Sequence, residues 1–250
     1  MKLKLLFLFL FASLISNAQI SGGYAIYKKQ SEPLTDEMLK KIDSVPDISE
    51  KAKEMFTNMN KTLPQTIEKF EYKLVFNNNK GKYSKLGDLS VDDSNTRYAE
   101  IRAGGKDDYY YDLDALCSIR DSNTFGERVL ITTSSMEMNW VLSKESKVIN
   151  GAVCFKGTTT EMVSNIKGDY LREIVAWYNP SINIPLGPEG YMGLPGLIVE
   201  IENNGITTYL YELKNGNVKE KIKIPTKGKK MNKSEYQDYS KEMAMRFRGR

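Results

Sequence analysis

Hydrophobic and polar residues alternate with a period of two along much of the chain. Over residues 70–76, Phe70, Tyr72, Leu74 and Phe76 alternate with other residues, which predicts a half-buried β-strand. Further segments are rich in Tyr, Val, Ile and Thr, which suit a pleated surface. They predict strands over 97–102, 108–113, 128–133, 139–142 and 147–149.

Three Asn-Gly pairs lie between strand-like segments, at residues 150–151, 204–205 and 215–216. Asn and Gly tolerate the positive φ of a type I′ turn, so each pair predicts a two-residue β-hairpin. The segment 174–178 is apolar at every position and predicts a central strand covered on both faces. These features favour an antiparallel meander over a βαβ repeat, because no helical segment separates the later strands.

Helical periodicity is confined to residues 35–61 and 233–247. Residues 35–61 predict a helix in two pieces, the second with an apolar stripe over 55–59 and an end at Pro64. Residues 233–247 predict a C-terminal helix. The predicted fold class is therefore mostly β: a strongly twisted antiparallel meander sheet, preferably a half-barrel, with an N-terminal helical segment and a C-terminal helix.

The N-terminus has the pattern of a secretory signal peptide. Two lysines precede an apolar run over residues 5–15, and the small residues at 16–18 end in Ala18 before Gln19. The run is shorter than the roughly 20 residues that span a bilayer, and no cysteine follows it for lipid attachment. We expect residues 1–18 to be removed and residues 19–250 to form one exported domain, periplasmic or outer-membrane associated, with no transmembrane segment.

Composition narrows the chemistry. The chain has no histidine, which excludes Ser-His-Asp and Cys-His catalysis and histidine-ligated metals but leaves carboxylate pairs and Ser-Lys nucleophiles. The net charge of +4 gives no reason to expect nucleic acid. Eleven basic and four acidic residues lie within 219–250. That segment could meet an anionic partner, although a solvated surface is the simpler interpretation.

Three other groups of residues have two interpretations each. Cys117 and Cys154 could form a disulfide in an oxidising compartment or stay as separate thiols. The aspartates and tyrosines of 107–114 resemble a sugar or cation site, but the spacing is not that of a calcium loop, which favours a solvated strand edge. Eleven methionines lie mostly at apolar positions, which favours core packing over copper binding. We predict no catalytic, metal or cofactor residue.

The segment after residue 178 is dense in proline and glycine. Residues 187–190 and 194–197 both place proline second in a tight turn, and a strand is expected over 197–201. The segment is either a binding loop or a backbone corner that leads into a core strand. The second interpretation is favoured, because each residue has a turn or packing role. If the loop binds a partner, the residues we expect to be exposed are Glu189, Tyr191 and Met192.

The corner carries a specific resemblance. Its residues are Gly193, Leu194, Pro195, Gly196, Leu197 and Ile198. This hexapeptide resembles the signature of the GLPGLI family, a group of exported proteins of Bacteroidetes-type bacteria. Segments 70–77, 140–142, 149–156, 176–178 and 184–188 are similar to that family too, with departures at Ala152 and Gly157. The resemblance implies an exported protein of unknown function, associated with outer-membrane transport receptors.

Two functions remain open. The first is a non-catalytic binding or accessory module, with an envelope protein such as an outer-membrane transport system, or an apolar ligand, as its partner. It predicts an apolar groove without facing carboxylates. The alternative is a carboxylate-dependent hydrolase acting on an envelope or imported polymer, with two acidic residues roughly 5–10 Å apart in one cleft. The absence of a catalytic motif favours the first.

Overall fold

The computed structural model describes residues 22–32, 40, 49–77, 79–87, 94–165, 168–216, 218 and 220–248. The expected signal peptide and the first piece of the expected N-terminal helix lie outside these residues, apart from residue 40.

Most of the described residues belong to strands. These are β1 (Gly22–Ser31), β2 (Glu71–Asn77), β3 (Lys80–Leu86), β4 (Asp108–Asp112), β5 (Cys117–Thr124), β6 (Glu127–Ser134), β7 (Val141–Ile149), β8 (Ala152–Asn165), β9 (Gly168–Asn179), β10 (Leu197–Asn203), β11 (Ile206–Asn215) and β12 (Lys229–Asn232). The helical elements are α2 (Glu50–Ile67), α3 (Ser94–Arg102), α4 (Lys233–Arg248) and the 3₁₀ turns η1 (Ser135–Met138) and η2 (Pro188–Gly190).

All of these strands form one sheet, in the order β12-β6-β5-β4-β3-β2-β1-β11-β10-β9-β8-β7. Two antiparallel meanders, β1 to β6 and β7 to β11, meet where β1 pairs with β11. Only the short β12 adds in parallel, beside β6. The mostly-β class with flanking helices is confirmed, and the sheet is mixed and unclosed rather than wholly antiparallel.

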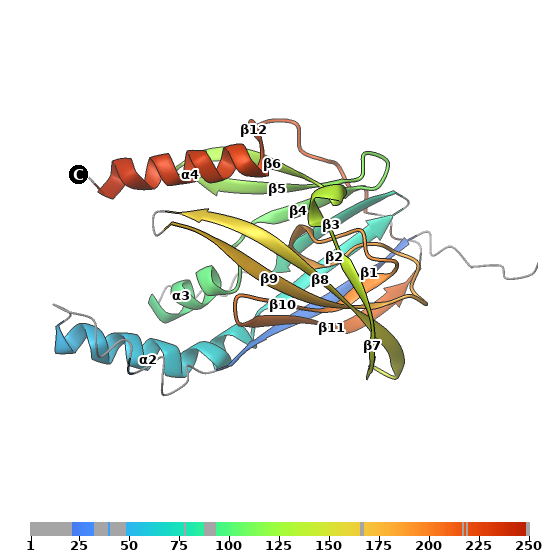
Figure 1. Cartoon of the computed structure of the whole chain (residues 1–250), viewed down its shortest axis with the longest axis horizontal. Coiled ribbons are helices and arrows are strands. Elements are labelled where there is room, and N and C mark those ends of the chain that lie inside the picture. Colours follow the sequence, from blue (N-terminus) through green and yellow to red (C-terminus); the bar gives the residue numbers. More distant parts are fainter. Residues whose placement is uncertain are drawn as a thin grey trace, which may run out of the picture.

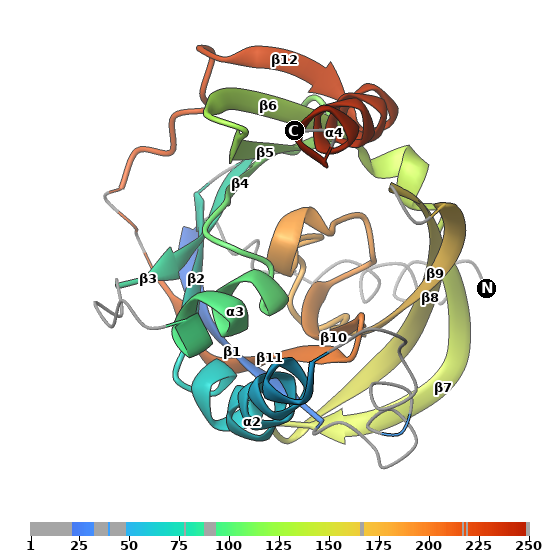
Figure 2. The same ribbon diagram turned by 90° about the vertical axis from the view of Figure 1, so that its left-hand side faces the viewer.

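The sheet twists strongly and curves around its own interior (Figures 1 and 2). The segment between β9 and β10, which carries η2, lies inside that curve, while α4 lies beside β6 and β12. Buried side chains from both meanders and from the inner segment pack together, including Tyr27, Leu74, Tyr111, Leu186 and Leu194. Each large buried side chain contributes about 1.5–3 kcal/mol through the apolar area it removes from water.

Two of the three predicted Asn-Gly hairpins are confirmed. Asn150 and Gly151 join β7 to β8, and Asn204 and Gly205 join β10 to β11, all with positive φ. The hairpin predicted at 215–216 is wrong. The edge of β11 away from β10 is already taken by β1, so the chain leaves the sheet at residue 216.

The strand predicted over 97–102 is also wrong, because this segment lies within α3. Ala99 and Ala103 are both buried against the core. Their spacing of four places them on one helical face, a signal that the apparent alternation hid. The segments 139–142 and 147–149 are not two strands. Residues 139–140 connect η1 to β7, which then runs without a break to Ile149.

The second piece of the N-terminal helix is α2, whose N-cap is Ser49. It continues past Pro64 to Ile67, because Leu63 and Ile67 are buried and their packing offsets the cost of an internal proline, about 3 kcal/mol. The predicted stripe is wrong: Met55 and Phe56 are exposed. None of the described helices has the length and apolar character that crossing a membrane requires.

Candidate functional site

The segment between β9 and β10 is fixed inside the curve of the sheet by hydrogen bonds to its backbone. The Tyr111 hydroxyl donates to the Gly187 carbonyl at 2.5 Å and accepts from the Gly190 N–H at 2.9 Å. The Trp140 indole N–H donates to the Met192 carbonyl at 2.9 Å. Tyr111 belongs to β4 of the first meander and Trp140 immediately precedes β7 of the second, so residues from both parts of the sheet hold the loop.

η2 contains an unusual backbone conformation. Glu189, which follows Pro188, has φ 54° and ψ 32° in the left-handed region. A residue other than glycine pays a strain cost there, and such residues cluster at functional sites. The conformation aims the Glu189 carboxylate at Lys29 of β1. A buried ion pair therefore holds the strained turn.

Lys29 is almost wholly buried, with 1% of its surface exposed. Its ammonium group donates to the Glu189 carboxylate and to the Ala103 carbonyl, and lies 4.4 Å from the centre of the Tyr72 ring. A buried charge needs such a set of partners, since an unpaired one costs several kcal/mol.

Close packing accounts for the Pro-Gly motif. A Cβ on Gly196 would lie 2.2 Å from the Asn179 carbonyl oxygen, and one on Gly157 would lie 2.8 Å from Leu194. These contacts support the interpretation of 193–198 as a packed corner. The expectation that the preceding loop is exposed is wrong: Tyr191 and Met192 are 5% and 1% exposed and face inward.

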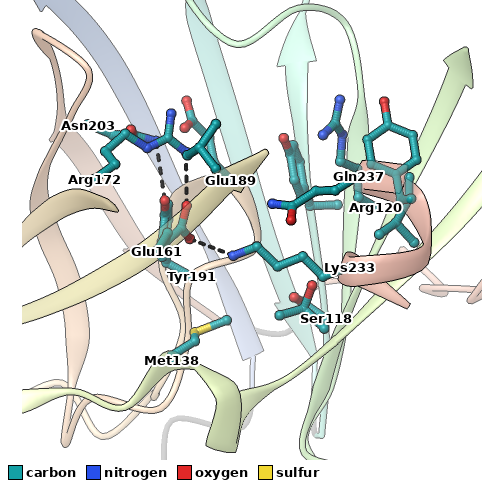
Figure 3. Close-up of a pocket in the computed structure, with 16 residues that line it drawn as sticks. Ser118, Arg120, Met138, Glu161, Arg172, Glu189, Tyr191, Asn203, Lys233 and Gln237 are labelled. Carbon is teal, nitrogen blue, oxygen red and sulfur yellow. Dashed lines mark hydrogen bonds and ion pairs between the residues drawn. The ribbon is translucent and has the colours of Figure 1, made fainter. Parts of the chain in front are cut away.

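A polar cavity of about 220 Å³ lies between this loop and α4, where strands from the two meanders face each other without pairing (Figure 3). Its lining residues come from strands, η1, η2 and α4. They are Tyr109, Ser118, Arg120, Ile131, Thr133, Met138, Glu161, Val163, Arg172, Glu189, Gly190, Tyr191, Asn203, Lys233, Tyr236 and Gln237.

Glu161 of β8 is the centre of the charged groups in this cavity. Arg172 lies opposite it in the β8–β9 pairing and donates from Nη2 at 2.9 Å. Lys233, the first residue of α4, lies 3.0 Å from the other carboxylate oxygen. Burial alone would raise the pKa of Glu161, but Lys233 and Arg172 outweigh it and lower that pKa. Glu161 is therefore ionised at neutral pH.

The lining also contains a paired arginine and two tyrosines that are buried or partly buried. Arg120 pairs with Asp107 at 2.5 Å, and its guanidinium lies 5.4 Å from the Tyr236 ring centre. Burial raises the pKa values of Tyr109 and Tyr191, and nearby Glu189 raises both further. These two hydroxyls therefore stay protonated and can act as hydrogen-bonding groups.

The lining does not match either form of site that the sequence suggested. The predicted apolar groove does not describe this cavity, because charged and hydroxylated side chains line it together with apolar ones such as Ile131, Met138 and Val163. Glu161 and Glu189 do line one cavity, as a hydrolase would need, but both are held in ion pairs. A general acid needs a raised pKa, and that of Glu161 is lowered.

A second cavity, of about 260 Å³, is mainly apolar. Side chains of Ile149, Ile182, Val199 and Leu210 line it, with Asn150 and Asn179 at its polar part. Among the described residues, no buried side-chain atom without a partner lies there. The polar cavity is therefore the stronger candidate site.

The structure separates the other residues that the sequence singled out. Cys117 on β5 and Cys154 on β8 are free thiols in different meanders. Tyr109 and Tyr111 face inward, and Tyr110 faces Lys82 on the other side of β4. β4 lies between β3 and β5, so the expected strand edge is wrong. In the described residues no group of three or more His, Cys, Asp or Glu could hold a metal ion.

Sequence reasoning missed the residues at the centre of the cavity: Glu161, Arg172, Asn203 and Lys233. A cross-strand charge pair in the sequence could have identified two of them, Glu161 and Arg172. Glu161 and Arg172 are opposite charges at paired positions of two adjacent strands, a cross-strand pair that a hairpin register predicts. Lys233 and Asn203 reach the cavity only through the curvature of the whole sheet.

Part of the chain matches the model of a protein family whose function is unknown. Residues 168–200 match the family described as "Protein of unknown function (Porph_ging)". The match covers β9, the inner loop and the start of β10. No curated protein shows significant similarity to the chain.

Two solved structures of PNGF-II, in the P21 and C2 space groups, are similar to this chain at 11% and 13% sequence identity, with TM-scores of 0.48 and 0.45. Each match covers 87% of this chain and 32% of the solved chain. This chain thus spans about a third of the length of those chains, and similarity at this level supports no statement about activity.

Proposed function

We propose that the chain is an exported, non-catalytic binding module of the cell envelope that holds a small polar ligand in the cavity between the inner loop and α4. The observation that carries the proposal is a strained, buried turn whose residues line a polar cavity. Glu189 is held in the left-handed region beside a fully buried lysine. Strain of this kind persists where the surroundings over-determine it, and pre-organised binding sites are one use of it.

The lining supports binding over catalysis. Its carboxylates are engaged by cations, which fixes their geometry and keeps Glu161 from acting as a proton donor at neutral pH. The sequence suggested Tyr191 as a residue that contacts a protein partner. Because Tyr191 is buried and lines the cavity, contact with a ligand in the cavity is the better interpretation. The family match to a group of unknown function is compatible with this proposal and does not restrict it further.

The test is to purify the mature protein from the periplasm of its own cells and examine it by native mass spectrometry. We expect a small-molecule adduct that denaturation releases. Thr133→Trp should remove it, because Thr133 lines the cavity. Thr132→Trp is the matched control, since Thr132 is exposed on the same strand. Absence of any adduct after incubation with a cell extract, or equal loading of both variants, contradicts the proposal.

A hydrolase is the second candidate, and the presence of Glu161 and Glu189 in one cavity is the observation in its favour. It predicts release of reducing ends from envelope or imported polysaccharide. Both Glu161→Gln and Glu189→Gln should then abolish that release. If the wild-type protein releases none, while the native adduct is present, the hydrolase is excluded for the polymers tested.

A further inference from the structure

One wall of the polar cavity is formed by a part of the sheet that has no third strand beside it. The pairing of β7 with β8 ends at Thr158, and the pairing of β10 with β9 ends at Val175. Further out, residues 160–165 of β8 pair with residues 168–173 of β9 alone within the described sheet. We call these two ranges the hairpin arm. Figure 1 shows the arm extending away from β7 and β10.

The hairpin arm contributes no side chain to the hydrophobic core. None of its residues is buried, whereas Thr159 and Ile174 at its base are 5% and 0% exposed. Met162 and Leu171, which pair with each other on the arm, are both exposed. A two-stranded ribbon is only marginally stable by itself, and segments with few buried contacts open at a low free-energy cost. The arm can therefore move without disrupting the core.

Polar contacts with α4 hold the arm in place. Glu161 of the arm pairs with Lys233 at 3.0 Å (Figure 3), and the Met162 carbonyl accepts from Nε2 of Gln237 at 2.7 Å. The helix itself is attached to the other side of the cavity, because β12 directly precedes α4 and pairs with β6. These contacts therefore join an anchored helix to a weakly supported arm.

Separation of the arm from α4 would leave no carboxylate without a counter-ion. Arg172 lies on the arm and donates to Glu161, so the two charges move together and stay paired. The other group near Glu161 is the Tyr191 hydroxyl of the inner loop, which is neutral. The movement therefore avoids the cost of an unpaired buried charge, which makes most ion pairs poor hinges.

Entry to the inner part of the cavity requires a movement of this kind. Ser118, Ile131 and Tyr191 line the cavity but are only about 5% exposed or less. The walls on which they lie are held firmly, since β5 and β6 are paired on both sides and hydrogen bonds fix the inner loop. The hairpin arm is the wall with the fewest constraints.

We infer that the hairpin arm is a flap that opens the polar cavity, hinged at its base and latched to α4 by Lys233 and Gln237. The arm carries the lining residues Glu161, Val163 and Arg172, so its movement removes one wall of the cavity at once. As the route by which a ligand enters, the flap rests on the proposed binding function. The movement itself is measured without a ligand, so the two can fail separately.

The experiment measures how fast a thiol inside the cavity reacts. Ser118→Cys is introduced into the full mature chain together with Cys117→Ala and Cys154→Ala, which leaves one thiol on the β5 wall. The reagent is methyl methanethiosulfonate, which is small and neutral, and mass spectrometry follows the reaction. We expect labelling about a hundredfold slower than in the urea-unfolded chain. Its rate should depend only weakly on low urea concentrations, because flap opening exposes much less surface than unfolding.

Variants of α4 test the latch. Lys233→Met and Gln237→Ala each remove one contact with the arm, and each should speed labelling roughly two- to tenfold. Arg246→Met is the matched control, because Arg246 pairs with Glu242 within the same helix, and it should leave the rate unchanged. Thermal unfolding verifies that every variant folds.

Hydrogen exchange identifies the part that moves. Lys233→Met should speed exchange of the amides of the hairpin arm, because a detached two-stranded ribbon frays. It should leave exchange in α4 beyond its first turn unchanged. Faster exchange in α4 alone overturns the assignment, since the helix would then be the moving part.

Three labelling results also overturn the inference. Labelling of the Ser118→Cys protein as fast as that of the unfolded chain means that the cavity has no closed state. A urea dependence as steep as that of global unfolding means that only the unfolded protein admits the reagent. Equal rates in Lys233→Met, Gln237→Ala and the Arg246→Met control mean that α4 does not latch the arm. None of these results removes a native ligand adduct, so the binding function is judged by its own test.

Discussion

The two Lys–Glu clusters that flank the inner loop use the same residue types in different surroundings. Lys29 is almost wholly buried, with 1% of its side chain exposed, and Glu189 is 15% exposed. Lys233, at 33% exposure, reaches Glu161 from the end of a surface helix. The first pair ties the strained turn to the central strand β1, and the second ties α4 to β8 across a cavity. The glutamates of the two pairs are equally exposed, so burial of the lysine, at 1% against 33% exposure, distinguishes the pair at the strained turn from the pair at the cavity.

The largest effect should come from the buried pair. Lys29→Met leaves the Glu189 carboxylate without a counter-ion, and the free energy of unfolding should fall by about 3–5 kcal/mol. Urea denaturation measures this. Lys28→Met is the matched control, because Lys28 is half-buried, pairs with the exposed Glu71 and should cost less than about 1 kcal/mol. Similar losses in both variants would remove the distinction drawn between the clusters.

A double variant sharpens the same comparison. Glu189→Gln added to Lys29→Met removes the uncompensated charge, so part of the lost stability should return. If the loss of unfolding free energy in the double variant equals the sum of the losses in the two single variants, the two side chains are not energetically coupled. The geometry of the turn would then have another origin.

A smaller effect should follow from loss of the hydroxyl that holds the turn on its other side. Tyr111→Phe removes one bond to the Gly187 carbonyl and one from the Gly190 N–H, so the free energy of unfolding should fall by about 1–3 kcal/mol. Tyr110→Phe, on the opposite face of β4, should change it by less than about 0.5 kcal/mol. Chemical denaturation of both variants measures the difference. Equal denaturation midpoints would contradict the role assigned to the Tyr111 hydroxyl.

The ion pairs of Glu161 at the cavity should make the free energy of unfolding depend on pH. The folded-state pKa of Glu161 lies below its ordinary value of 4.5, so its contribution to stability is fully present above about pH 4.5 and is lost as the pH falls through the lowered folded-state pKa. Wild type should therefore exceed Glu161→Gln in unfolding free energy at pH 7, and the gap should narrow toward pH 3. A constant gap across this range contradicts the ion-pair assignment.

The weakest contact in this comparison joins α4 to the start of β9. Lys241 lies 3.5 Å from Asp169, and both groups face solvent. Lys241→Ala should leave the global unfolding midpoint unchanged and should speed hydrogen exchange only in α4 at low salt, because salt screens exposed pairs. A clear drop in the global midpoint would mean that α4 is part of the cooperative core.

The sequence predicts many of the strands and the packed corner much better than it predicts the cavity. Period-two alternation and β-favouring composition locate β2, β4, β6 and parts of β7, β9 and β10, and the Asn-Gly turns locate the β7–β8 and β10–β11 hairpins, since these signals are local. β1 was missed because Lys28 and Lys29 interrupt its apolar pattern, although Lys29 faces the interior. Whether a lysine side chain is buried depends on Glu189, 160 residues away, which no local pattern reveals.

The candidate site depends even more on distant contacts. Its lining comes from both meanders and α4, so it exists only when the sheet has curved and α4 has docked. The loop with Glu189 and Tyr191 was predicted to be exposed but is buried, because a segment rich in proline and glycine has the composition of a surface loop. Here the tyrosine and tryptophan hydrogen bonds satisfy its backbone inside the fold.

The pairing of β1 with β11 determines when this protein can fold. β1 is the first described strand, yet one of its two neighbours is formed by residues 206–215. During synthesis the middle of the sheet therefore keeps an open edge until residues 206–215 are available for pairing. Contacts so distant in sequence slow folding, and unpaired edges invite association with other chains. Folding should thus be a late event, and truncation before residue 206 should yield an aggregating fragment rather than a smaller stable protein.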